Sequence, residues 1–213
     1  MNAGHRLEKT IEILKYKYDI SHTDSELKLY DKYVNSIISW NSFAKLVSVS
    51  SLDALYDHIA DSLTLLPHLY PFRENKSVTY IDIGSGGGFP AIPLAINCPD
   101  LQIYLIEAHQ KKCTFLEKII RQLNLHNVTV VYDRFESIEI PGSRHIFTAR
   151  AIEKPLDVSK HIVNTMGIDD VYLAQTEAAH GLNKKNVVIE EMVDGFSESD
   201  VRRGKAYVVS RYT

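Results

Sequence analysis

The feature that most constrains the fold of this chain is a glycine-rich turn that follows an apolar run. Residues 78–83 are mostly β-branched or aromatic, which predicts a buried strand. Four glycines then fall within residues 84–88, and Pro90 occupies a position typical of a helix start. Because glycine accepts positive φ and has no Cβ, the backbone of such a turn can lie directly against a ligand. The stretch therefore predicts a strand, a ligand-binding turn and a helix.

The spacing of the glycines distinguishes two classes of nucleotide-binding turn. A dinucleotide fold needs G-x-G-x-x-G, but Phe89 stands where the third glycine would be. The chain instead shows D-x-G-x-G-x-G, formed by Asp82, Gly84, Gly86 and Gly88. This pattern resembles the first motif of S-adenosylmethionine-dependent methyltransferases with a doubly wound fold. A structural turn that binds no ligand is the alternative.

A second acid supports the interpretation as a cofactor site. Glu107 ends the apolar run 101–106 and lies 25 positions after Asp82. Nucleotide-binding folds place an acid at about this distance, at the end of the second strand, where it binds ribose hydroxyls. We therefore expect Glu107 to bind the cofactor ribose. Asp82 is expected to organise the turn or to meet the methionine amino group of the cofactor.

Composition limits the classes of protein to which this chain can belong. A chain of 213 residues with 45% hydrophobic residues can bury one sizeable core and still carry a helical extension. The formal charge of −3 and pI near 6.3 exclude a basic chain, so nucleic acid would have to meet a local patch. Cys98 and Cys113 lack the spacing of a zinc site, and we expect no bound metal.

The first 18 residues contain no long apolar run, so we expect neither a signal peptide nor a membrane span. Two cysteines do not make a disulfide framework, which favours a reducing compartment. A cytoplasmic protein that makes no membrane contact is the expectation.

Hydrophobic periodicity divides the chain into two parts. Residues 1–74 predict a helical extension, with helices near 7–16, from 23–25 to 41, and from Ser50 or Ser51 to Pro67 and Pro71. Residues 75–213 predict a domain in which strands alternate with helices, which indicates an α/β, doubly wound, Rossmann-like sheet. Its strands are expected at 78–83, 101–106, 127–132, 145–149, 170–174, 186–193 and 205–211, and its helices at 90–96, 111–123 and 155–166.

The last two strand-like runs have no helix between them. Seven strands that end in an antiparallel pair fit what the methyltransferase resemblance implies. Ligands of open α/β sheets lie at the carboxyl ends of the strands, where the strand order reverses. The residues that follow predicted strand ends should therefore share one crevice: Gly84 to Gly88, Glu107, Asp133 to Glu136, and Arg150.

Several blocks in fixed order make the resemblance more specific. They are Trp40-Asn41, the stretch from His58 to Leu63, the stretch from Asp82 to Pro90 with Ile92 to Ala95, Lys111-Lys112 with Phe115-Leu116, Arg134 to Glu136, and Thr148 to Ala151. Together they span about residues 27–160 and resemble the ribosomal small-subunit RNA methyltransferase G family, also called glucose-inhibited division protein B. The glycine turn that runs directly into Phe-Pro and Ile-Pro is the most specific of these blocks.

The resemblance implies methyl transfer from S-adenosylmethionine, which leaves as S-adenosylhomocysteine, to N7 of a guanine in the decoding-region loop of 16S ribosomal RNA. It also implies that Gly84 and Phe89 line the cofactor, that Phe135 and Glu136 meet its adenosine side, and that Arg150 closes the site. The partner would be 16S rRNA or the small ribosomal subunit particle, and we expect a monomeric enzyme.

Two departures from the family pattern concern the site. Ala91 stands where the family commonly has glycine, and the family usually has a Lys-Gly pair near the end of the fifth strand, where this chain reads Ala174-Gln175-Thr176-Glu177, with Gln175 in place of the lysine. If that lysine serves RNA binding or catalysis, its replacement affects target choice or activity. Two rival functions follow: a methyltransferase of the same fold with another substrate, and a catalytically silent protein that binds the cofactor or RNA.

The expected chemistry needs no general base, because guanine N7 already carries an in-plane lone pair and positioning supplies much of the rate enhancement. Arg150 is the candidate catalytic residue, through stacking or hydrogen bonding to the target base or contact with RNA phosphate; a surface salt bridge is the alternative. His58 and Asp61 lie three residues apart on a predicted helix and could face the cleft or only each other. Basic residues of the second half could contact phosphate if they share a face: Arg144, Arg150, Lys154, Lys184, Lys185, Arg202, Arg203 and Lys205.

Overall fold

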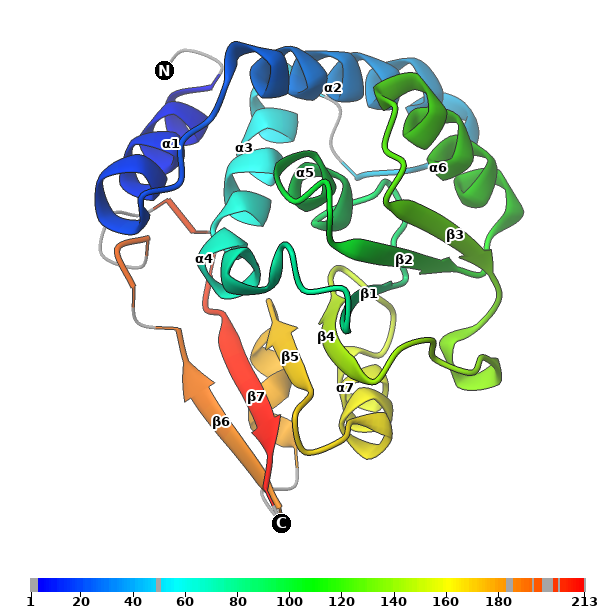
Figure 1. The fold of residues 1–213 in the computed structure, drawn as a ribbon. Helices are drawn as coiled ribbons and strands as arrows, with labels where there is room; N and C mark the ends of the chain where they lie inside the picture. Colours follow the sequence, from blue (N-terminus) through cyan, green and yellow to red (C-terminus); the bar gives the residue numbers. More distant parts are fainter. Residues whose placement is uncertain are drawn as a thin grey trace.

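The computed structural model describes residues 4–48, 51–182, 186–192, 194–196, 201–202 and 204–212. Its centre is one seven-stranded sheet with the order β3-β2-β1-β4-β5-β7-β6 (Figure 1). The strands are β1 Val78–Ile83, β2 Gln102–Glu107, β3 Val128–Tyr132, β4 Arg144–Ala149, β5 Val171–Ala174, β6 Val187–Glu191 and β7 Tyr207–Arg211. Because the order reverses between β1 and β4, the predicted doubly wound fold is confirmed.

Strands β1 to β5 pair in parallel, and β7 runs antiparallel to both β5 and β6. This confirms the predicted antiparallel last pair. All six residues of β1 are buried, as expected for a central strand that is covered on both faces. The strand register places Ile83 beside Ile106 of β2 and beside Ala149 of β4. The carboxyl ends of these three strands therefore lie at one edge of the sheet.

Helices cover both faces of the sheet (Figure 1). The α-helices are α1 His5–Tyr18, α2 Asp24–Ala44, α3 Leu52–Leu63, α4 Leu66–Leu69, α5 Ala91–Asn97, α6 Gln110–Leu123 and α7 Pro155–Thr165, and short 3-10 helices are η1 Tyr70–Phe72, η2 Phe135–Ser137 and η3 Glu177–Gly181. Buried side chains of α1 to α6 form one core with Tyr80 of β1, and those of α7 form a second core with Ile81 and Phe147. The described connection from β3 to β4 contains η2 and no α-helix.

Local chemistry explains where the helices begin and end. Thr23 and Glu26 form a reciprocal capping box at the start of α2. Ser51 caps α3, whereas Ser50 lies outside the described residues. The predicted third helix is two helices, because Pro67 has no N–H to donate to the carbonyl of Leu63 and a new helix, α4, begins around it. The helix after the glycine turn begins at Ala91, one residue later than predicted, with Pro90 as its N-cap.

One hydrophobic core joins the N-terminal helices to the sheet. It contains Leu14 of α1, Tyr30 of α2 and Ile59 of α3 together with Ile92 of α5 and Ile103 of β2. Burial of apolar surface in such a core is the main contribution that stabilises the folded state. The extension is therefore packed on the sheet over a continuous apolar surface, and the domain boundary after residue 74 stays a prediction.

The predicted basic patch is wrong for Arg202. Its side chain is only 2% exposed and forms an ion pair with Asp194 at 2.6 Å. It also donates to the carbonyl oxygens of Thr64 and Met192, which ties the segment before β7 to the end of α3. Such a buried, fully bonded guanidinium presents no charge to a phosphate. Lys184, Lys185 and Arg203 lie outside the described residues.

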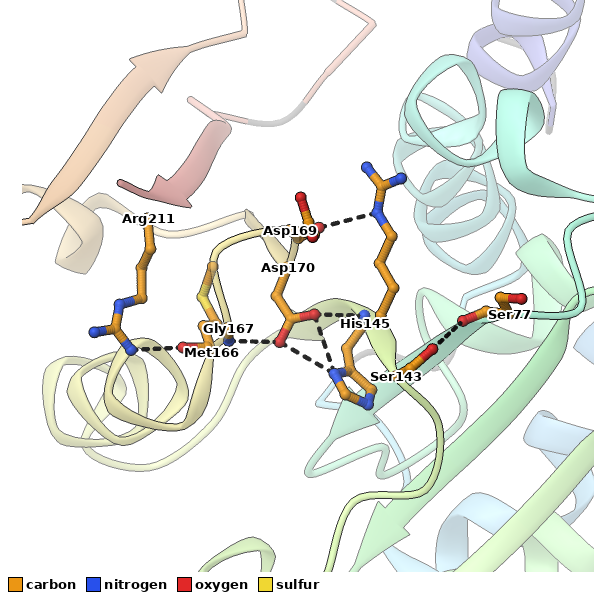
Figure 2. A network of polar contacts seen from close by, with 9 residues as sticks. Ser77, Ser143, His145, Met166, Gly167, Asp169, Asp170 and Arg211 are labelled. Atoms are coloured by element: carbon orange, nitrogen blue, oxygen red, sulfur yellow. Dashed lines mark hydrogen bonds and ion pairs between the residues drawn. The ribbon is translucent and has the colours of Figure 1, made fainter. Parts of the chain in front are cut away.

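Figure 2 shows a polar network around His145 and Asp170. His145 lies at the start of β4 and Asp170 directly precedes β5, so the network is at the amino edge of the sheet, whereas the glycine turn follows the carboxyl end of β1. Asp170 accepts hydrogen bonds from the backbone N–H of His145 at 2.7 Å and of Gly167 at 2.8 Å, and its carboxylate meets His145 Nδ1 at 3.1 Å. The hydrogen bond to Asp170 raises the pKa of His145, against the effect of burial. Burial alone would raise the pKa of Asp170, but bonds from His145 and Gly167 lower it.

Asp170→Asn should lower the free energy of unfolding by about 1–3 kcal/mol near neutral pH, because two backbone N–H groups lose a charged acceptor. Because the pKa of His145 is raised above 6.5, the ion-pair part of the stabilisation is present below that pH and is lost as the pH rises through the folded-state pKa. Chemical denaturation should therefore show that the deficit of the variant shrinks from about pH 6 to about pH 9. His126→Gln, at an exposed histidine, is the control, and a deficit that does not change with pH would contradict the ion pair.

Candidate functional site

The glycine turn leaves β1 in a backbone conformation that ordinary residues rarely adopt. Gly84, Gly86 and Gly88 have φ values of 68°, 56° and 94°. A Cβ added at Gly84 would approach Ile152 Cγ2 to 2.7 Å, and one at Gly88 would approach Ile92 Cγ1 to 2.6 Å. A Cβ at Gly86 would meet only backbone oxygens, at 3.7 Å and beyond. Two glycines are therefore required by packing, and Gly86 is required mainly by its φ.

Glu107 holds this turn from the end of β2. Its Oε2 accepts a hydrogen bond from the N–H of Gly86 at 2.8 Å, and its Oε1 accepts one from the N–H of His109 at 2.9 Å. The residue is 4% exposed, so both bonds form away from water, where a charge-assisted bond is strong. The acid that ends β2 is thus the residue that fixes the turn after β1 and the start of α6.

Asp82, near the end of β1, belongs to a second set of hydrogen-bonded residues, with Thr148 and Tyr80. Thr148 of β4 donates to its Oδ1 at 2.7 Å, and Tyr80 contacts Thr148 Oγ1 at 2.6 Å. The other carboxylate oxygen, Oδ2, is buried and has no hydrogen-bond partner. Burial raises the pKa of Asp82 to about 7, although the bond from Thr148 opposes this shift. The hydrogen bond from Thr148 joins Asp82 to β4, and the predicted role of Asp82, in organising the turn or in meeting the methionine amino group of the cofactor, stays a prediction.

A cavity of about 360 Å³ opens at the point where the strand order reverses. One wall is the glycine turn, and another is the segment after β4. Four of the predicted cofactor residues line it: Gly84, Gly86, Phe89 and Arg150. Asp82 and Glu107 support the turn from behind without lining the cavity. The predicted crevice therefore exists and brings together the ends of β1 and β4.

The N-terminal extension supplies the facing wall, and the sequence did not predict the part of it that follows α2. Lys45 to Ser48, after α2, line the cavity. Asn41 fixes this segment, because its side chain donates to the carbonyl of Val47 at 3.1 Å and accepts from the N–H of Val47 at 3.0 Å. Tyr33 donates to the carbonyl of Gly87 at 2.7 Å and ties α2 to the turn itself. For the segment after α2 the sequence signal is the adjacent pair Trp40-Asn41, whereas His58 of α3, which was expected to face either the cleft or only Asp61, also lines the cavity.

Arg150 is held in the cavity by two residues of α3. Its guanidinium forms an ion pair with Asp61 at 3.2 Å, and Nη2 lies 2.5 Å from His58 Nδ1. A guanidinium has donors only, so Nδ1 is the acceptor and neutral His58 carries its proton on Nε2. The Arg150 side chain is 14% exposed, and its Cζ lies 5.9 Å from the centre of the Phe89 ring. Arg150 is therefore a partly buried, oriented group and not a surface salt bridge.

Gln175 extends this cluster from the end of β5. Its Nε2 donates to the backbone oxygen of Asp61 at 3.3 Å. Gln175, which stands in place of the family's usual lysine, therefore contacts Asp61, the residue that forms the ion pair with Arg150. Gln175 carries no charge and so adds none to the Arg150–Asp61 pair.

Five of the predicted cofactor residues do not line the cavity: Asp82 and Glu107, which lie behind the turn, and Gly88, Phe135 and Glu136. Gly88 faces α5 and Tyr33, on the inner side of the turn. Phe135 is buried in the second core, with its ring centre 5.1 Å from that of His161. Glu136 is exposed beside it, in η2. The roles of Phe135 and Glu136 on the adenosine side stay predictions.

Neither cysteine is placed as a nucleophile. Cys98 is the C-cap residue of α5 and Cys113 lies in α6, and both are buried. Burial raises the pKa of the Cys98 thiol to about 12 and that of Cys113 to about 11, so both are protonated at neutral pH. In the described part of the chain, no group of three or more His, Cys, Asp or Glu residues could hold a metal ion.

Solved structures share this fold. MtNAS in complex with MTA and tNA matches with a TM-score of 0.54 at 13% identity, over 95% of this chain and 76% of that one. A variant of MtNAS in complex with S-adenosylmethionine matches with a TM-score of 0.53 at 12% identity, over 95% of this chain and 77% of that one. At such low identity these matches show the fold alone.

Sequence comparison shows the family. Ribosomal RNA small subunit methyltransferase G of Chromobacterium violaceum is 34% identical over 153 residues, which cover 71% of this chain and 71% of the relative. The protein of the same name from Nitrosomonas eutropha is 32% identical over 168 residues, which cover 76% and 74%. The family model GidB, described as rRNA small subunit methyltransferase G, matches residues 26–193. This chain therefore belongs to the GidB family, the rRNA small subunit methyltransferase G proteins.

Proposed function

We propose that this protein transfers the methyl group of S-adenosylmethionine to N7 of a guanine in the decoding-region loop of 16S ribosomal RNA. Family membership makes the chain an S-adenosylmethionine-dependent rRNA methyltransferase, and the target atom and the loop are the new part of the proposal. The observation that carries it is the cavity at the reversal point of the sheet, where a glycine turn faces an oriented arginine.

The residues of the site fit this cofactor. Gly84, Gly86 and Gly87 line the cavity with backbone alone, and a Cβ at Gly87 would come within 3.3 Å of the Leu46 carbonyl oxygen. These glycines and Phe89 would hold the cofactor, with Glu107 toward the ribose and Asp82 below. Asp82 Oδ2 is a buried acceptor that no residue satisfies. Phe135 and Glu136 are assigned to the adenosine side. When bound, S-adenosylmethionine supplies an electrophilic methyl group on a positively charged sulfur.

The chain's own residues then have to position the base. Guanine N7 is a lone-pair acceptor at neutral pH, so no proton has to be removed before it attacks. Arg150 can donate to O6, beside N7, and leave the N7 lone pair free. His58 is occupied at Nδ1 by Arg150, which removes that nitrogen as a base. Asp61 and His58 fix the guanidinium, and fixed geometry is the main contribution that such a site makes to the rate.

The partner follows from the same proposal. We assign 16S rRNA, free or within the small ribosomal subunit, as the substrate of a monomeric cytoplasmic enzyme. None of the helices in the described ranges is long and apolar enough to cross a membrane. The rival functions are transfer to another substrate, for which uncharged Gln175 is the supporting observation, and silent binding of the cofactor or RNA.

Methyl transfer is tested with small-subunit rRNA from cells that lack the protein, given as naked rRNA and as particles. We expect label from S-adenosylmethionine to enter the rRNA as 7-methylguanosine, identified by mass spectrometry of the nucleosides. Label in another nucleoside would contradict the target atom. Cofactor binding with no transfer to either form of rRNA would favour a rival function.

Gly86→Val should weaken S-adenosylmethionine binding by at least about 10-fold, because a β-branched residue resists positive φ and its side chain would enter the cavity. Gly204→Val is the matched control, since Gly204 also has positive φ, at 76°, with nothing within 4 Å of its Cβ position. Both variants should lose similar stability in thermal unfolding. Calorimetry should find lost affinity only for Gly86→Val, and equal affinity in both would remove the turn from the site.

Arg150→Lys should lower the single-turnover rate of methyl transfer by about 10- to 100-fold with the fold intact, because an ammonium cannot bond to Asp61, His58 and the base in one plane. Arg144→Lys is the control, at the other end of the same strand, where Arg144 donates to the Asp169 carbonyl at 3.0 Å. Unchanged transfer by Arg150→Lys would show that the guanidinium does not position the target.

A further inference from the structure

We propose that one surface of α2 and α6 holds single-stranded rRNA beside the cavity. This aromatic–lysine surface consists of Trp40 and Phe43 of α2 with Lys111 and Lys118 of α6. The inference rests on the proposed function and deepens it, because it names where the substrate strand lies. In Figure 1 these two helices run side by side, next to the carboxyl edge of β2 and β3.

Phe43 of this surface is open to solvent and is held by its neighbours, and Trp40 beside it is half-buried. Phe43 is 57% exposed, and Trp40 meets it edge to face with ring centres 5.9 Å apart. Trp40 in turn packs on buried Phe115, with ring centres 6.0 Å apart. An exposed aromatic ring that is held in place by its neighbours offers a flat apolar face to a partner. Unstacked RNA bases are such a partner, because every base offers a π-face to an aromatic ring.

The ammonium group of a lysine lies close to each ring. Lys111 Nζ lies 4.5 Å from the centre of the Phe43 ring, and Lys118 Nζ lies 4.7 Å from that of Trp40. The two lysines are seven residues apart, two turns along the exposed face of α6. Aromatic rings for bases next to ammonium groups for phosphates are the arrangement that binds single-stranded nucleic acid.

The charge of this region differs from that of the whole chain. The net charge of the protein is −3, yet residues 32–52 contain no Asp or Glu. Helix α6 contains Glu117 as its one acid beside Lys111, Lys112, Lys118 and Arg121. This local excess of cations fits a polyanion better than an uncharged protein surface. The basic patch that was predicted from the sequence lay in the second half of the chain, whereas these cations lie in α6.

The aromatic–lysine surface is continuous with the cavity. Lys45 lies two residues after Phe43, and Lys112 follows Lys111, and both Lys45 and Lys112 line the cavity. A strand that stacks on Phe43 and Trp40 can therefore pass between these two lysines toward Arg150. The target base would leave the stack at this point, as it must to reach a buried reacting atom.

The test is binding of a fluorescein-labelled single-stranded RNA of about 12 nucleotides, followed by anisotropy across a salt series. Phe43→Ala should raise Kd by about 5- to 50-fold and leave the salt slope unchanged, because stacking is lost and no charge is removed. Lys111→Gln and Lys118→Gln should each reduce the slope of log K against log salt by about 0.7, the value for one phosphate contact on a single strand.

Helix α1 offers a matched control. Tyr16 is 81% exposed and Lys15 Nζ lies 5.5 Å from its ring centre, so Tyr16→Ala and Lys15→Gln remove the same chemistry elsewhere on the molecule. Both controls should bind RNA like the wild type, and all five variants should bind S-adenosylmethionine normally in calorimetry.

Equal losses in the α1 controls, or RNA binding that the α2 and α6 variants leave unchanged, would overturn the inference. If the wild type still methylates rRNA in that case, the proposed function survives. A wild type that neither binds RNA nor methylates rRNA would overturn both. If the α2 and α6 variants bind RNA normally but fail to bind a ribosomal protein, the surface serves a protein partner instead.

Discussion

The site depends on one buried carboxylate that bonds to two backbone N–H groups. Glu107 accepts from Gly86 in the turn after β1 and from His109 before α6. Parallel pairing brings the ends of β1 and β2 level, so an acid at the end of β2 can reach the turn at all. Without this acceptor, the N–H of Gly86 would lose its partner and the positive-φ turn would lose its support. The cavity wall is therefore fixed by strand register and one charge.

The N-terminal extension packs on the sheet and also contributes residues to the site. Its contributions are the segment Lys45 to Ser48, held by Asn41, and the pair His58 and Asp61 that orients Arg150. Tyr33 reaches the turn from α2. The sheet alone would leave the cavity open on this side and Arg150 without its ion pair. A pocket at the topological switch point is general for this fold, and here the extension determines its shape.

Local patterns predicted the fold well, because period and turn chemistry act over short distances. The alternation of apolar runs gave the seven strands, and the glycines gave the turn, since no other residue type fits Gly84 and Gly88. Glu107 was expected beside a ligand, and no pattern in the sequence indicated that it also bonds to the N–H of Gly86. The link between Asn41 and Val47 was not predictable, because a side chain that bonds to a loop backbone leaves no periodic trace.

Charge was the least predictable feature. Arg202 was predicted as a possible phosphate contact, but its side chain is buried and bonds to Asp194 and to two backbone carbonyl groups. The lysines of α6 were not among the residues predicted to contact RNA, and it is the fold that places Phe43 and Trp40 against Lys111 and Lys118. In both cases, contacts between distant segments decide whether a charge is free to meet RNA. The sequence alone contains the residues but not these contacts.

The cofactor site is tested most directly by a crystal structure of the protein with S-adenosylhomocysteine. The ligand should lie on the backbone of Gly84 to Gly87, within the cavity bounded by Leu46, Phe89 and Arg150. A ribose hydroxyl should lie within hydrogen-bonding distance of Glu107. Ligand density elsewhere on the sheet, or a bound ligand that makes no contact with the glycine turn, would show that this turn is not the cofactor site.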